Sequence, residues 1–204
     1  MNFSVMNRRT AVSLLLAVSS LLLSCSGRPD NVAFLDKELG LRETYRKAFL
    51  DKVAALKNMR TEGMPFAEEY RLNALIAEEY SSFSFDSTMT YLERNHALAT
   101  ENGDDVLLAE TDLLKVNEYI RAGYHVEASN LLAAIRPDMV KPEQKRLWFS
   151  VRHSLAGEMM SYSGGQDLYE VKFAERNEMR DSLMRYVEPD SFEWYFLNRE
   201  AALS

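Results

Sequence analysis

Two stretches of the chain repeat one pattern of apolar positions, and each has the spacing of a pair of helices. The first helix of each pair carries an apolar residue three positions before a tyrosine, Ala77 with Tyr80 and Val116 with Tyr119. Both residues therefore recur at an offset of 39. Apolar residues at three- and four-residue steps share one face of a helix. A fixed period of this size predicts stacked helix pairs, because a single pair cannot cover its own apolar face.

The second helix of each pair has its own signature, a small residue four positions before a leucine. Thr88 precedes Leu92 in this way, and Ala128 precedes Leu132. A small side chain lets the two helices of a pair cross closely, so we expect Ala128 to be buried. A third copy of the first helix is placed around Ala156, 40 positions beyond its counterpart in the second pair. The second helix of the third unit has no small residue at the expected place. We therefore expect the third unit to be longer than the others.

Helix stop and start signals divide the chain further. Gly103 fits the left-handed position after a helix, and Asp104 can cap the next one. Asp190 with Glu193 three positions later is a capping-box pattern. Since no segment alternates in the manner of a strand, we expect an all-α solenoid of helical hairpins. The expected helices span residues 31–60, 66–82, 86–101, 104–122, 124–135, 142–162, 167–187 and a short terminal stretch after Asp190.

The predicted organisation is a leader, a tether and one helical-repeat domain. The boundaries are 1–24 for a lipoprotein signal peptide, 25–30 for a lipidated tether and 31–204 for the domain, which comprises a capping helix (31–60), repeat 1 (66–102), repeat 2 (104–136), a longer third unit (142–187) and a terminal helix (190–204). The helix at 31–60 carries one apolar stripe with charged residues on its other faces. It is either a cap for the repeat stack or a dimerising coiled coil; the cap is favoured because the stripe is not a sustained heptad.

Residues 1–24 are typical of a targeting segment. Arg8 and Arg9 precede an apolar run, Ala11 to Leu23, that is too short and wrongly flanked for a spanning helix. Residues 22–25 read Leu-Leu-Ser-Cys and resemble a bacterial lipobox. The resemblance implies cleavage before Cys25, a diacylglycerol thioether on its sulfur and an acylated amino terminus; an ordinary signal peptide with a chance cysteine is the alternative. Because no acidic run follows Cys25, the expected location is the cell envelope, lipid-anchored in the outer membrane and facing the periplasm.

Charge and cysteine content bear on nucleic-acid binding and on disulfide formation. The formal net charge is −7, and loss of Arg8 and Arg9 with the leader makes it −9. This balance argues against nucleic-acid binding by this segment, which needs a clustered basic face. Cys25 is the only cysteine, so no disulfide can form within one chain.

Residues with catalytic or metal-binding potential do not form a recognisable site. The three histidines, His96, His125 and His153, lie 29 and 28 positions apart, with no second ligand at helical spacing. We expect each to be a surface or turn residue. Adjacent acids such as Glu78 and Glu79 do not face each other on a helix. Gly164 lies in a glycine pair without the residues of a phosphate-binding loop. The sequence therefore predicts no catalytic residues, no metal site and no cofactor.

The repeat resembles the tetratricopeptide repeat (TPR), whose unit of ~34 residues sets small and aromatic residues at fixed offsets. The period here is longer, so the chain is similar to a divergent member. It also resembles an uncharacterised envelope family in which a helical extracytoplasmic part precedes further repeats, a membrane span and a cytoplasmic helix-turn-helix segment. Residues 34–39, 85–87 and 176–183 carry this likeness, which covers the N-terminal extracytoplasmic part alone.

The TPR resemblance implies a concave groove lined by the first helices. The positions of this chain that correspond to the groove face of the TPR family are Arg71, Ala74, Glu78 and Ser81 in the first pair, Glu110, Leu113, Asn117, Ile120 and Arg121 in the second, and His153 and Met160 in the third. The candidate partner-binding residues among them are Arg71, Glu78, Ser81, Glu110, Asn117 and Arg121. We expect their charges to be exposed and to contribute little to folding.

Mixed charge beside an apolar strip suits a peptide or protein ligand. The resemblance therefore implies a membrane-anchored protein-binding or sensor module of the cell envelope, without catalysis. The alternatives are an accessory lipoprotein of glycan uptake and a structural protein of envelope assembly. The face could also be merely solvated, or covered by a further repeat.

Overall fold

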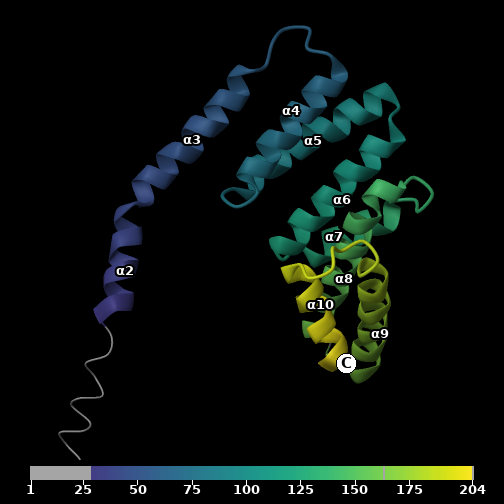
Figure 1. The fold of residues 1–204 in the computed structure, drawn as a ribbon. Helices are drawn as coiled ribbons and strands as arrows, with labels where there is room; N and C mark the ends of the chain where they lie inside the picture. Colours follow the sequence, from purple (N-terminus) through teal and green to yellow (C-terminus); the bar gives the residue numbers. More distant parts are fainter. Residues whose placement is uncertain (1–28, 163, 204) are drawn as a thin grey trace, which may run out of the picture. The chain divides into compact units, whose positions relative to one another are not determined.

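The computed structural model describes residues 29–162 and 164–203, and all regular structure in these ranges is helical. The expected all-α fold is confirmed. The elements, labelled as in Figure 1, are α2 (Pro29–Gly40), α3 (Arg42–Asn58), α4 (Phe66–Tyr80), α5 (Phe85–Asn102), α6 (Asp105–Arg121), α7 (His125–Ala134), the short 3₁₀ helix η1 (Pro142–Gln144), α8 (Lys145–Ser161), α9 (Gln166–Leu183) and α10 (Phe192–Leu203).

The described chain forms two units, residues 29–52 and residues 53–203. The first unit contains α2 and the beginning of α3. One helix was expected over 31–60, and this expectation is wrong: the helix breaks at Leu41, whose N–H donates to the carbonyl of Glu38 at 3.1 Å. The physical reason is Gly40, which costs about 1 kcal/mol against alanine inside a helix.

The second unit is a series of helical hairpins. The helices of α4–α5, α6–α7 and α8–α9 pack against each other, and α5 also packs on α6 and α6 on α8 (Figure 1). The repeat register is confirmed by burial. Ala77 and Val116 are both buried, and Tyr80 and Tyr119 are both half-buried against the core. Ala156 in the third unit is buried as well.

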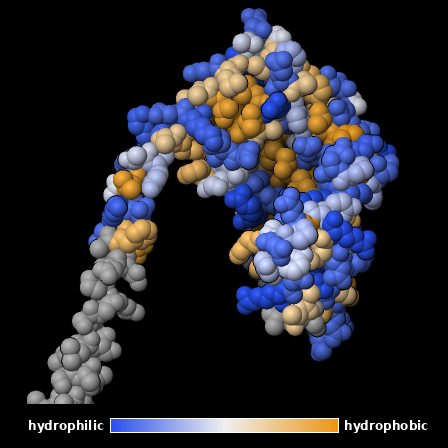
Figure 2. All heavy atoms as spheres, in the orientation of Figure 1, coloured by the Kyte–Doolittle hydropathy of each residue, from blue (hydrophilic) through white to orange (hydrophobic). Residues whose placement is uncertain are grey.

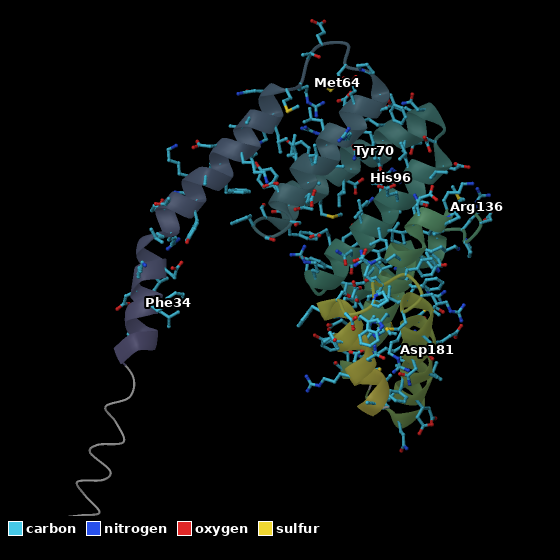
Figure 3. The ribbon with its side chains drawn as sticks, viewed as in Figure 1. Phe34, Met64, Tyr70, His96, Arg136 and Asp181 are labelled. Carbon is cyan, nitrogen blue, oxygen red and sulfur yellow. The ribbon has the colours of Figure 1, made fainter. Side chains whose placement is uncertain are left out.

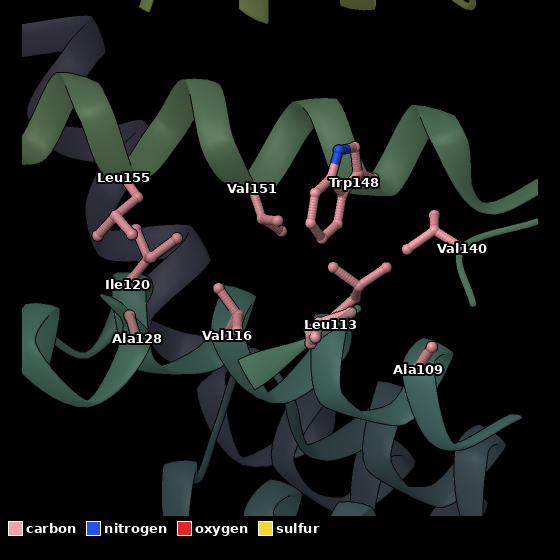
Figure 4. Packing of buried hydrophobic residues seen from close by; sticks show 10 residues of the cluster. Ala109, Leu113, Val116, Ile120, Ala128, Val140, Trp148, Val151 and Leu155 are labelled. Atoms are coloured by element: carbon pink, nitrogen blue, oxygen red, sulfur yellow. The ribbon is translucent and has the colours of Figure 1, made fainter. Parts of the chain in front are cut away.

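The largest apolar cluster lies among α6, α7, the following loop and α8 (Figure 4). Trp148 and Val151 on α8 point towards Leu113 and Val116 on α6. Ala128 on α7 is fully buried in the same cluster, as its small size predicted. Smaller clusters form around Ile76 in the first hairpin and around Leu183, Val187 and Leu197 where α10 packs.

A buried polar network joins the first hairpin to α6. The hydroxyl of Tyr70 (Figure 3) lies 2.8 Å from that of Thr111 and donates to the carbonyl of Leu107 at 3.1 Å. The amide of Asn95 on α5 donates to the backbone carbonyl of Tyr70 at 3.0 Å. Burial raises the pKa of Tyr70 to about 12. The phenol therefore stays neutral and keeps its proton for donation.

Two predicted helix ends can be compared with the structure. Gly103 has φ 64°, and the carboxylate of Asp104 accepts from the N–H of Leu107 at 3.0 Å, so the expected joint is confirmed. At α10 the expectation that Asp190 caps the helix is wrong. Ser191 fills that role, because its hydroxyl accepts from the N–H of Trp194 at 3.1 Å. Asp190 instead takes the turn itself, with φ 63°.

Candidate functional site

A cavity of about 370 Å³ opens between α4 and α6, and α5 forms its floor. We call it the α4–α6 groove. Its lining residues are Arg71, Ala74, Leu75, Ala77, Glu78 and Ser81 from α4 and its end, Thr88 and Leu92 from α5, and Leu114, Asn117, Glu118 and Arg121 from α6. Five of the six candidate partner-binding residues line this one cavity. The exception is Glu110.

Helical spacing explains why these side chains converge. On α4, Arg71, Leu75 and Glu78 recur at steps of four and three and so share a face. On α6 the same holds for Leu114 and Asn117, which continue to Arg121. Each helix thus contributes an apolar residue and polar residues to the same space. The groove has an apolar floor with charged and amide groups around it.

Arg121 closes one end of the groove by linking α6 to the end of α4. Its guanidinium donates to the carboxylate of Glu118 and to the backbone carbonyl of Ser81, each at 2.9 Å. Burial raises the pKa of Glu118, and the neighbouring Arg121 opposes that rise. Arg121 is exposed, as expected, but its charge is paired within the fold. Its guanidinium stabilises a buried carboxylate and ties two hairpins together.

Three polar side chains of the groove are available to a ligand. Within the described ranges the side chains of Arg71, Glu78 and Asn117 make no hydrogen bond or ion pair. Arg71 and Glu78 are exposed, and Asn117 is half-buried. They supply a cation, a carboxylate and an amide beside the exposed side chain of Leu75. This set can hold the backbone and mixed side chains of a peptide.

The remaining positions taken from the TPR resemblance lie outside the α4–α6 groove. Glu110 faces Gln144 of η1, with 3.4 Å between the amide nitrogen and the carboxylate. Leu113 and Ile120 are buried core residues, so their expected place on the groove face is wrong. These two are rotated by about one residue, roughly 100°, from the face that contains Leu114. His153 and Met160 line a separate cavity of about 510 Å³ beside α9 and α10.

His153 belongs to a cluster that the sequence did not indicate. It is buried, and its Nε2 lies 2.9 Å from the carboxylate of Glu200 on α10, which also accepts from Arg176 on α9. The expectation of a surface or turn position is wrong for this histidine. The cluster was missed because its members are 24 and 47 residues apart and follow no periodicity.

Burial lowers the pKa of His153, chiefly by desolvating the charged form, although Glu200 favours the protonated ring. The pKa of this histidine in the folded protein lies below its ordinary value of 6.5, so the unfolded chain binds the proton more readily. The folded protein therefore loses stability as the pH falls through 6.5. We therefore expect the melting temperature to fall more steeply in the wild type than in His153→Gln between about pH 7.5 and pH 5.5.

The glutamine keeps an N–H donor for Glu200 but does not titrate, so the difference between the two curves reports His153 alone. Circular-dichroism melts at several pH values provide the measurement. Parallel curves for the two proteins would contradict the assigned role of this ring.

Metal-binding and membrane-spanning features are also absent from the described residues. Among the described residues, no three His, Cys, Asp or Glu side chains come together as a set that could hold a metal ion. None of the described helices is both long enough and apolar enough to cross a bilayer. Cys25, the expected lipidation site, lies outside the described residues.

Comparison with known proteins agrees with the hairpin architecture. No curated protein matches the chain, and no solved structure matches it. A family model described as the SusR N-terminal TPR domain matches residues 39–204. TPR domains are typically non-catalytic interaction modules. The match runs from the end of α2 through α10 and includes both walls of the α4–α6 groove, so the chain belongs to the SusR N-terminal TPR domain family.

Proposed function

We propose that this chain is a protein-binding or sensor module of the bacterial cell envelope that takes a peptide segment of its partner in the α4–α6 groove. The observation that carries the proposal is the convergence of Arg71, Glu78 and Asn117, all without partners in the described chain, on one cavity with an apolar floor. Membership of a TPR family supports a protein partner over a small molecule.

The chemistry of the groove favours a peptide of mixed character. Ala74, Leu75, Leu92 and Leu114 offer an apolar strip for aliphatic side chains. The guanidinium of Arg71 can donate to a carboxylate or to backbone carbonyls, and the amide of Asn117 can both donate and accept. These groups fix the orientation of a bound segment, while the apolar floor provides most of the buried area.

The proposed location rests on the leader. Lipid attachment at Cys25 would hold the domain on the membrane through the few residues between Cys25 and α2, with the outer membrane and the periplasm as the proposed site of action. The lipobox-like residues 22–25 support this anchor.

The groove is tested by Arg71→Glu. Because Arg71 is exposed and unpaired, the reversal should change the free energy of unfolding by less than about 1 kcal/mol. Binding of a partner isolated from the protein's own envelope extract should weaken about tenfold, which corresponds to loss of one charge-assisted hydrogen bond of ~1.5 kcal/mol. Calorimetric titration of the isolated partner measures this loss, and a melt measures stability.

Arg185→Glu is the matched control. Arg185 follows α9, is exposed and has no partner in the described chain, so it makes the same charge change away from the groove. It should bind like the wild type. If Arg71→Glu also binds like the wild type, the groove is not the binding site. Arg121 is unsuitable for this test, because its reversal would also remove the cation beside buried Glu118.

A further inference from the structure

Helix α2 carries an apolar stripe on its surface. Val32, Leu35 and Leu39 recur at steps of three and four, so they lie on one face, and they are 54%, 58% and 67% exposed. Phe34 also extends from this helix into solvent (Figure 3) and is 61% exposed. Apolar and charged side chains alternate over this segment in the space-filling view (Figure 2). A row of large exposed apolar side chains along one helix face marks an interaction surface.

The structure within residues 29–52 leaves α2 without support from its own unit. Helix α2 has 12 residues, and α3 continues from it end to end instead of folding back beside it. The hydroxyl of Tyr45 donates to Glu38 at 3.1 Å across the break at Leu41, which keeps the two helices in line. An isolated helix of about 12 residues is marginal in water. A partner that covers the stripe would stabilise α2.

The charges of the two helices are opposite in sign. Helix α2 holds three carboxylates, Asp30, Asp36 and Glu38, against one cation, Lys37. Within residues 42–52, α3 holds four cations against two carboxylates. A second copy aligned antiparallel would therefore place an acidic helix against a basic one twice, once at each end. A parallel copy would place like charges together, which is destabilising.

We propose that residues 29–52 form an antiparallel, two-fold dimer interface in which α2 of one copy lies on α3 of the other. The two-fold axis passes near Leu41, so Val32 of one copy lies near Leu50 of the second and Asp36 lies near Arg46. Leu50 is 48% exposed and provides apolar surface on α3 for the incoming stripe. Such an interface is self-complementary and closes on itself, as dimer interfaces with two-fold symmetry do.

A membrane surface is the less fitting occupant of the stripe. Helices that lie in the bilayer interface carry lysine and arginine on their polar face, which attract anionic lipid headgroups. The polar residues of α2 are mostly acidic, with Lys37 as the exception. Anionic headgroups would repel this helix, whereas α3 of a second copy attracts it.

Cysteine cross-linking tests the arrangement, because Cys25→Ser leaves the full chain free of thiols. In that background the purified chain carrying both Val32→Cys and Leu50→Cys should form a covalent dimer on mild oxidation. Positions 32 and 50 lie 18 residues apart, or about 27 Å along a helix, so they cannot join within one copy. Each single variant should form no covalent dimer, because its two copies of the same position lie about 27 Å apart in the antiparallel pair.

Charge exchange adds a rescue test. Asp36→Lys in the double-cysteine chain should lower the rate of cross-linking about tenfold or more, and adding Arg46→Glu should restore it. Asp86→Lys, an exposed acid on α5, is the control and should leave the rate unchanged. Three results would each overturn the proposal. In the first, Val32→Cys alone cross-links as fast as the double variant, and in the second the double variant forms no covalent dimer. In the third, Asp36→Lys drives the chain onto phosphatidylglycerol vesicles, and adding Arg46→Glu does not restore the dimer.

Discussion

Ala128→Asp is expected to unfold residues 53–203 at ordinary temperature. Ala128 is 0% exposed and lies on α7 within the cluster shared with α6 and α8 (Figure 4). A carboxylate there would have no water and no cationic partner within the cluster, which costs several kcal/mol. The whole stability of a domain is about 5–15 kcal/mol. A circular-dichroism melt should show no cooperative transition, or one lowered by tens of degrees.

Ala133→Asp on the same helix is the control. Ala133 is exposed, so the same substitution there should cost only a few tenths of a kcal/mol, partly from its place near the helix C-terminus. An Ala128→Asp melt that matches the wild type would mean that α7 does not pack on α6 and α8 as described.

Cys25→Ser is expected to abolish membrane association. Each buried methylene contributes about 0.8 kcal/mol to anchoring, and one acyl chain alone gives only marginal binding. The lipobox resemblance implies three chains on residue 25, so removing the thiol removes all of them. The variant should either keep its leader or appear in the aqueous phase. Detergent phase partition with mass measurement of the product distinguishes these outcomes.

Ser26→Ala, one residue further on, should partition with the wild type. A Cys25→Ser protein that has lost its leader and still enters the detergent phase would refute the lipid anchor. Failure here would leave the groove test unaffected, because Arg71 lies in a different part of the chain.

Helix positions and the repeat register could be predicted because periodicity reports burial directly. Ala77 and Val116 occupy equivalent buried places, and the offset of 39 placed them there. The groove was largely predictable because the TPR resemblance implies which face of each first helix lines it. Five of the six candidate residues taken from that resemblance share one cavity.

The errors have different physical causes. Leu113 and Ile120 were placed on the groove face because one residue of rotation, roughly 100°, separates that face from the core. The contact of His153 with Glu200 depends on how α10 packs on α8, and no local pattern encodes it. Ser191 replaced Asp190 as the cap because a one-residue shift of a helix start changes the capping side chain.

The hydrogen bonds of Tyr70 limit how freely the repeats of this chain can be exchanged. Repeat arrays usually tolerate shuffling, since each unit contacts its neighbours through similar apolar surfaces. Here the unit after the first hairpin supplies a specific polar partner, the hydroxyl of Thr111, which is fully buried beside that of Tyr70. In a duplicated or transplanted hairpin without it, the Tyr70 hydroxyl would keep only a backbone carbonyl such as that of Leu107, and the loss of one hydrogen bond would cost about 0.5–1.5 kcal/mol. The order of the first two hairpins is thus favoured by this side-chain pair as well as by apolar packing.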